Sequence, residues 1–191
     1  MYQKSILLAF LSSLAAALPQ LLPSQDPQLQ AKMSQFVGCA RLRVADVGSN
    51  TTSSFLSPDS QEYELYSTGD RPRVPRAPLA IYMPMTEEEI IKAVQCAHKM
   101  NLQVVPRGGG HSYEGFSSQD GAIVLDLSMH REVKIVSTRG NDGTATVGGG
   151  ARLGNVYIAL SKDGFNYNAG TCPSVGIGGH VGGNLSFIIT F

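Results

Sequence analysis

The stretch that decides the fold is LAIYMPMTEEEIIKAVQCAHKMNLQVVP, residues 79–106. Two short runs in it, Ala80–Met83 and Gln103–Val105, are rich in apolar residues and typical of strands. Between them, Thr86 stands three residues before Glu89, which is the capping-box pattern of a helix start, and apolar residues then recur at helical spacing. Strand, helix and strand in this order predict a βαβ unit with a right-handed crossover.

Further elements are expected on both sides of this unit. Helices are predicted at about Asp26–Phe36 and over Arg152–Lys162, the second ending at Gly164. Strands are predicted at Ala122–Leu127, Lys134–Val136 and Thr144–Val147. This order, a βαβ start followed by hairpin-like strands, predicts an α+β fold. The proline-rich run over residues 71–78 cannot be helical, so we place an N-terminal extension over residues 18–74 and a domain over residues 75–191.

Residues 1–17 have the pattern of a secretory signal peptide. Lys4 precedes an apolar run over Ile6–Ala17 that ends in small residues typical of a cleavage site. A run of 12 residues is too short to span a bilayer, which needs about 20. We therefore expect a secreted protein with a cleaved leader and no membrane partner. The sequons at Asn50 and Asn184 agree with glycosylation in that compartment.

Composition excludes several other classes of protein. With 42% hydrophobic residues, the chain of 191 residues is not a disordered segment, a coiled coil or a collagen-like fibre. Its 15 basic and 15 acidic side chains cancel. Because no basic surplus is available to neutralise phosphates, we expect no nucleic-acid partner.

A first glycine-rich loop, RGGGHSY, follows the second strand of the βαβ unit at residues 107–113. Three successive glycines allow positive φ and let backbone N–H groups converge on an anion such as a pyrophosphate, whose charge a nearby arginine could also meet. The pattern matches neither a Walker loop nor a Rossmann fingerprint, and a tight turn is the plain alternative. The candidate cofactor-binding residues here are Arg107, Gly108, Gly109, Gly110, His111 and Ser112.

A second glycine-rich loop, GTCPSVGIGGHVGG, covers residues 170–183. Apolar residues interleave with its glycines, which favours a close-packed backbone over a flexible linker. A metal site formed by His111, Cys172 and His180 is an alternative, but the spacing matches no zinc pattern, so we expect no metal. The candidate cofactor-binding residues here are Cys172, Gly176, Gly178, Gly179 and His180.

In their order and spacing the two loops resemble those of the berberine bridge enzyme-like oxidoreductases, which have a PCMH-type FAD-binding domain and belong to the vanillyl-alcohol oxidase group. The resemblance runs from about Pro75 to Gly183. It implies a βαβ-containing subdomain followed by the start of a second α/β subdomain. It also implies that His111 bonds the flavin 8α-methyl carbon and that Cys172, 61 positions later, bonds flavin C6. The two loops are then expected to face one another across an open cleft.

The resemblance further implies an activity and a disulfide. The activity is that of an oxidase that takes a hydride from a CH–OH or similar carbon onto bicovalently held FAD and passes electrons to O₂. The substrates would be small molecules such as carbohydrates, alkaloids or other secondary metabolites. The chain has three cysteines, an odd number for an exported protein, and the resemblance pairs Cys39 with Cys96, which leaves Cys172 for the flavin.

After Gly183 the sequence departs from the family. The family continues with further glycines and several hundred residues, whereas here only Asn184–Phe191 follow. We therefore expect a C-terminally truncated chain, in which the family's catalytic base, a tyrosine or an acid, has no matching position. The alternative to an active oxidase is a catalytically inactive flavin-domain remnant or a gene-model fragment, which would bind flavin weakly or not at all.

Overall fold

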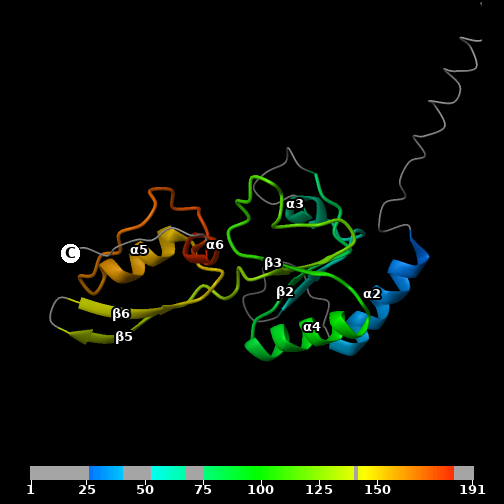
Figure 1. Cartoon of the computed structure of the whole chain (residues 1–191), viewed down its shortest axis with the longest axis horizontal. Coiled ribbons are helices and arrows are strands. Elements are labelled where there is room, and N and C mark those ends of the chain that lie inside the picture. Colours follow the sequence, from blue (N-terminus) through cyan, green and yellow to red (C-terminus); the bar gives the residue numbers. More distant parts are fainter. Residues whose placement is uncertain (1–25, 41–52, 68–74, 140–141, 183–191) are drawn as a thin grey trace, which may run out of the picture.

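The structure is a computed structural model and describes residues 26–40, 53–67, 75–139 and 142–182. The expected signal peptide, both sequons and the segment 184–191 lie outside these residues. One part of the chain carries α2 (Pro27–Ala40), β1 (Ser54–Leu56), α3 (Tyr63–Ser67), β2 (Ala80–Met83), α4 (Glu87–Lys99), β3 (Val104–Arg107) and β4 (Ile123–Asp126). The next part carries β5 (Val133–Arg139), β6 (Asp142–Val147), α5 (Leu153–Ser161) and α6 (Ile177–Gly182). The two parts form two adjoining lobes (Figure 1).

The sheet of the first lobe contains three strands that the sequence predicts, β2, β3 and β4, but their order in the sheet is not predicted. Its order is β1-β2-β4-β3, with β2, β4 and β3 mutually parallel and β1 antiparallel to β2. The two strands of the βαβ unit are therefore not neighbours, because β4 lies between them. Ile123, Val124 and Leu125 of β4 are almost completely buried, as the middle of a parallel sheet requires. Pro106 lies in β3 at the edge of the sheet, where a missing N–H is tolerated.

Successive side chains of each strand point to opposite faces of this sheet, and both faces are apolar. Side chains on one face, among them Tyr82 and Ile123, pack in a cluster with residues of α2 and α4. Their neighbours Ile81 and Val124 point to the other face, where they pack beside Tyr63 of α3. Helices thus cover the sheet on both sides, and its carboxyl edge is left for the loops that follow β3 and β4.

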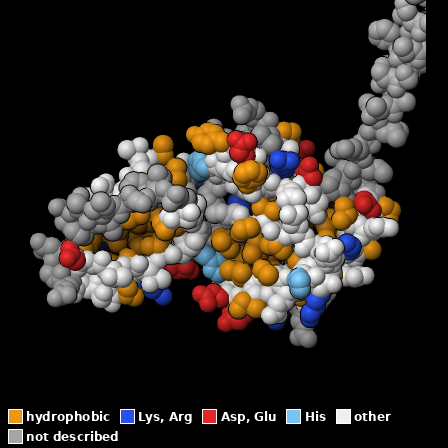
Figure 2. All heavy atoms as spheres, viewed as in Figure 1, with side chains coloured by type: hydrophobic (Ala, Val, Ile, Leu, Met, Phe, Trp, Pro, Cys, Tyr) orange, Lys and Arg blue, Asp and Glu red, His pale blue; other side chains and the backbone are white. Residues whose placement is uncertain are grey.

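The second lobe has a core of its own. β5 and β6 form an antiparallel hairpin, and α5 packs on it. The buried residues are Leu153, Val156 and Leu160 of α5 with Ala151 and Ile177. In Figure 2, hydrophobic side chains accordingly gather in separate areas on the two lobes. Both lobes together confirm the α+β fold class.

The sequence does not predict β1, α3 or α6, which are three to six residues long. In particular, it predicts a loop throughout residues 170–183, whereas Ile177–Gly182 are helical. Glycine has poor helix propensity, so a sequence such as IGGHVG gives no helix signal. Tertiary contacts stabilise this helix instead, because Ile177 is buried and its N–H donates to the Ala151 carbonyl.

The helix of the βαβ unit begins as its sequence predicts. The Thr86 hydroxyl accepts a hydrogen bond from the Glu89 N–H at 3.2 Å, and the Glu89 carboxylate accepts from the Thr86 N–H at 3.3 Å. The same carboxylate oxygen accepts from the Met85 N–H at 2.7 Å and from the Ser53 hydroxyl at 2.6 Å. Burial alone would raise the pKa of Glu89, but these hydrogen bonds to the charged form outweigh it, and the pKa is lowered from its ordinary value of 4.5.

A disulfide joins the N-terminal extension to the domain. Cys39 of α2 and Cys96 of α4 are bonded, with their Cα atoms 5.9 Å apart, as expected. Cys172 is free and exposed. None of the helices in the described ranges is both long and apolar enough to cross a bilayer.

Replacing both Cys39 and Cys96 with alanine should lower the free energy of unfolding. The two residues are 57 positions apart, and a loop of this size corresponds to about 4 kcal/mol in the loop-entropy model. Denaturant unfolding measures the loss, and a reductant should destabilise the wild type while leaving the double variant unchanged. Peptide mapping without reductant should recover the Cys39–Cys96 pair; a bond from either residue to Cys172 would contradict the structure.

Glu89→Gln should change how stability depends on pH. Because the folded pKa of Glu89 lies below the unfolded value of 4.5, its carboxylate stabilises the fold above that value, and this stabilisation is lost as the pH falls through the folded pKa. At pH 7 the variant should lose roughly 1 kcal/mol, as for the loss of a helix cap, and its stability should fall less steeply than that of the wild type as the pH drops below 4.5. Glu88→Gln, an exposed position in the same turn, is the matched control. Identical pH profiles for the two variants would refute this role of Glu89.

Candidate functional site

The first glycine loop begins where β3 ends, at the carboxyl edge of the sheet. Of its three glycines only Gly110 has a positive φ, 75°, and so needs the conformational freedom of glycine. Gly108 and Gly109 serve close backbone approach instead. A Cβ on Gly108 would lie 3.0 Å from the Gly149 carbonyl oxygen. Ser112 shapes the turn beyond the loop, because its hydroxyl accepts a hydrogen bond from the Phe116 N–H at 3.0 Å.

Arg107 is not placed as the sequence predicts. Its side chain is only 4% exposed, and Nε donates to Oδ2 of Asp126 at 2.8 Å. Its Nη1 donates to the backbone carbonyl of Tyr66. The guanidinium charge is therefore met inside the protein by a carboxylate, and Arg107 anchors the loop instead of offering its charge to an anion above it.

The second loop is held on the start of α5. The Gly154 N–H donates to the Pro173 carbonyl at 3.0 Å, and the Leu153 N–H donates to the Val175 carbonyl at 2.9 Å. These are first-turn N–H groups, which have no partner within their own helix. The segment that carries the exposed Cys172 is thus fixed by the amino end of α5, where Leu153 is buried.

Tyr157 fixes the beginning of this loop. Its phenol donates a hydrogen bond to the Gly170 carbonyl. Burial, with a smaller contribution from nearby Tyr167, raises the pKa of Tyr157. The phenol therefore remains protonated, and able to donate, throughout the neutral and mildly alkaline range.

The two loops meet directly. A Cβ on Gly109 would lie 2.4 Å from the Gly176 nitrogen, and a Cβ on Gly176 would lie 2.2 Å from the Gly109 nitrogen. Nε2 of His111 lies 3.0 Å from the Ser174 carbonyl oxygen, two residues from Cys172. Because a carbonyl oxygen only accepts, Nε2 carries the hydrogen, and the lone pair of the neutral ring is on Nδ1. The two loops approach one another as expected, but they do so by direct contact at these residues and not across the open cleft that was expected.

A third glycine turn takes part in this contact and is missing from the candidate residues of the sequence analysis. A Cβ on Gly178 would lie 2.8 Å from the Gly149 carbonyl oxygen, and Gly149 also faces Gly108. The neighbouring Gly150 packs against the Leu127 carbonyl, with 1.6 Å from an added Cβ to that oxygen. The signal was present, since residues 148–150 are a triple glycine like residues 108–110. Spacing alone does not show that the turn comes back to the other two loops.

The remaining candidates occupy the periphery of this contact. His180 lies in α6, and a Cβ on Gly170 would be 3.6 Å from its Cε1. Gly179 is exposed, with nothing within 4 Å of an added Cβ. Among the described residues no group of three or more histidine, cysteine, aspartate or glutamate side chains is placed to hold a metal ion.

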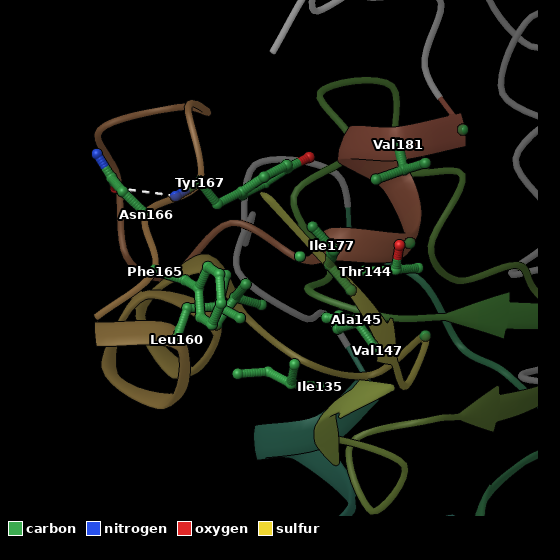
Figure 3. A pocket seen from close by; sticks show the side chains of 15 residues that line it. Ile135, Thr144, Ala145, Val147, Leu160, Phe165, Asn166, Tyr167, Ile177 and Val181 are labelled. Atoms are coloured by element: carbon green, nitrogen blue, oxygen red, sulfur yellow. Dashed lines mark hydrogen bonds between the residues drawn. The ribbon is translucent and has the colours of Figure 1, made fainter. Parts of the chain in front are cut away.

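An apolar pocket of about 630 Å³ lies inside the second lobe. Leu160, Phe165 and Ile135 line one part of it, and Ala145, Val147 and Ile177 line another (Figure 3). Neither His111 nor Cys172 contributes to this lining. The pocket therefore belongs to the core of the second lobe, and it reaches the contact between the glycine turns at Gly149 and Gly178, which also line it.

Comparisons with known proteins give a consistent result. The family described as "FAD binding domain" matches residues 78–187. Glucooligosaccharide oxidase of Sarocladium strictum is 38% identical over 152 residues, which are 78% of this chain and 28% of that protein. Berberine bridge enzyme-like 23 of Arabidopsis thaliana is 32% identical over 174 residues, which are 84% of this chain and 32% of that protein. The chain thus spans less than a third of the length of these relatives.

The fold is similar to that of solved oxidases. One is a glucooligosaccharide oxidase from Acremonium strictum, described as having a 6-S-cysteinyl, 8α-N1-histidyl FAD. It is 33% identical to this chain with a TM-score of 0.63, and the match covers 77% of this chain and 29% of that one.

Two adjacent glycines of α6 provide a test of the backbone contact. Gly178→Ala should lower the free energy of unfolding by roughly 1–3 kcal/mol, because its Cβ would press on the Gly149 carbonyl oxygen. Gly179→Ala, with open space around the new Cβ, should instead be neutral or stabilise by roughly 0.5–1 kcal/mol through helix propensity. Denaturant unfolding of both variants decides the matter. Equal effects would mean that the contact between α6 and the Gly149 turn does not matter.

Proposed function

Because this chain belongs to the FAD binding domain family of berberine bridge enzyme-like and carbohydrate-oxidising flavoproteins, we propose that it carries the flavin-attachment loops of an oxidase. Its fold is that of a PCMH-type FAD-binding domain, of which it has the βαβ-containing lobe and the start of the second. FAD, when bound, supplies the two-electron chemistry: it accepts a hydride from a substrate carbon. The residues of this chain bind and orient it.

The observation that carries the proposal is the hydrogen bond between His111 and Ser174, which brings the imidazole into the loop of Cys172. Imidazole and thiolate are the side-chain nucleophiles that can add to an electron-poor ring. His111 would use the lone pair on Nδ1, since Nε2 is occupied as the donor to Ser174. Cys172 is the free and exposed cysteine, whereas the other two are in the disulfide. In our proposal His111 is bonded to the 8α carbon and Cys172 to C6.

The glycines of the two loops fit the same group. Gly108, Gly109 and Gly176 present bare backbone, and their N–H groups are uncharged donors suited to phosphate oxygens. A side chain at Gly109 or Gly176 would overlap the opposite loop, so only glycine keeps both loops in place. The anion would therefore be met by backbone dipoles, since the charge of Arg107 is directed to Asp126.

We propose carbohydrates as the substrate class, with transfer of a hydride from a CH–OH carbon and of electrons to O₂. The support is the similarity to oxidases of glucooligosaccharides and chitooligosaccharides. We also propose that the protein is secreted after removal of residues 1–17. The Cys39–Cys96 disulfide supports this, because such bonds persist in oxidising compartments.

The covalent attachment can be tested in a chimera in which residues 78–182 replace the matching segment of glucooligosaccharide oxidase, so that the other walls of the site are supplied. The unmodified chimera should keep its yellow colour through acid precipitation, because covalent bonds survive unfolding. His111→Ala and Cys172→Ala should each retain flavin through the remaining bond, and the double variant should release it as free FAD.

His98→Ala, which changes an exposed histidine of α4, is the control and should retain flavin fully. Flavin lost from the unmodified chimera on unfolding would refute the covalent proposal. Release from Cys172→Ala alone would refute the role of His111 only.

A further inference from the structure

We infer that the buried Arg107–Asp126 ion pair is a positioning device that sets the distance between the two flavin loops. The inference rests on the proposed function in one respect, namely that the two loops hold a flavin. The rest of it is argued from contacts between described residues. Arg107 is the last residue of β3 and Asp126 the last residue of β4, and the two are partners in the register of the sheet. The pair therefore stands where both strands give way to loops.

Besides bonding to each other, both side chains of this pair hydrogen-bond to backbone outside the sheet. Oδ2 of Asp126 accepts from Nε of Arg107 at 2.8 Å, and Oδ1 accepts from the Ser128 N–H at 2.8 Å. Nη1 of Arg107 donates to the Tyr66 carbonyl at the end of α3. The Arg107 carbonyl itself accepts from the Leu127 N–H at 2.8 Å. Two side chains thus tie together the start of the first glycine loop, the start of the segment after β4 and α3.

A short path of hydrogen bonds continues from Asp126 to the other loops. The His130 N–H donates to the Leu127 carbonyl at 2.8 Å, and the Gly150 N–H donates to the His130 carbonyl at 2.9 Å. The adjacent Gly149 faces Gly108 of the first loop and Gly178 of α6. The ion pair is therefore connected to the His111 loop through β3, and to the second lobe through the segment 127–150.

Because the ion pair is buried, the directions of its hydrogen bonds are fixed. The side chains of Arg107 and Asp126 are 4% and 8% exposed, so neither can exchange its partner for water. Arginine is required because its planar fork meets a carboxylate and a carbonyl in different directions at once, which a lysine ammonium at a single point cannot do. The chain also has a partly exposed Arg–Asp ion pair, Arg76–Asp120, with 3.9 Å between nitrogen and oxygen and side chains 32% and 57% exposed, which serves as an internal control.

The test is hydrogen–deuterium exchange of the full chain, resolved by peptide, which needs no flavin. Asp126→Asn should speed exchange in residues 108–118 and 170–176 at least tenfold more than in α4. Arg107→Lys keeps the charge but only one of the two contacts, so it should show the same pattern to a smaller degree. Asp120→Asn, the same change in the partly exposed pair, keeps an Oδ1 acceptor for the Ala77 N–H and should leave both loops at the wild-type rate.

Phe36→Leu separates positioning from mere stability. Phe36 is a fully buried residue of α2, and this variant weakens the core of the first lobe without touching the ion pair. It should raise exchange in α4 and in the loops by similar factors. If Asp126→Asn and Arg107→Lys give that uniform pattern too, or leave the loops unchanged, the inference is overturned.

A second measurement links the pair to the flavin. In the chimera described above, Asp126→Asn should reduce the fraction of covalently retained flavin at least fivefold at a temperature where the protein is folded, while Asp120→Asn should not reduce it. Unchanged retention in Asp126→Asn overturns the positioning role. An unmodified chimera that binds no flavin, combined with selective loop exchange, would instead overturn the proposed function and leave the positioning role in place.

Discussion

The backbones of Gly109 and Gly176 approach so closely that a Cβ on either would overlap a main-chain nitrogen of the other. This contact joins two lobes whose cores are otherwise separate. Within the described residues, the sheet of the second lobe is a two-stranded hairpin, and such a hairpin is marginally stable when isolated. Its position therefore depends on packing with α5 and on the glycine turns that bring it against the first lobe. The candidate site lies at that junction because His111 comes from one lobe and Cys172 from the other.

Local signals in the sequence predicted most of the elements. The capping box at Thr86 and the apolar runs of β2 and β4 are determined by neighbours along the chain, and the structure has them at the predicted positions. The order β2-β4-β3 was not predictable in the same way, because the strand between the two ends of the βαβ unit arrives later in the sequence. Short elements such as β1 and α6 depend on tertiary contacts and gave no periodic signal.

The candidate site shows the same division. The two loops and their nucleophilic side chains stood out in the sequence because glycine runs and cysteine are unusual. The direction of the Arg107 side chain could not be predicted from the sequence. An arginine beside a glycine loop suggests an anion ligand, and only the structure shows its buried partner Asp126. The Gly148–Gly150 turn was overlooked for a related reason. It contacts Gly108, which lies some forty residues earlier in the sequence, and only the folded structure shows that the two are neighbours.

The proline in β3 has a consequence for the solution behaviour of the protein. β3 lies at the edge of the sheet, and an edge strand offers free N–H and C=O groups on which another polypeptide can form a new strand. Pro106 is exposed and removes one of these donors, so the row of hydrogen bonds that such an added strand would need is broken in its middle. Pro106, next to the last residue of β3, therefore disfavours edge-to-edge pairing with other chains, which an unbroken edge would allow.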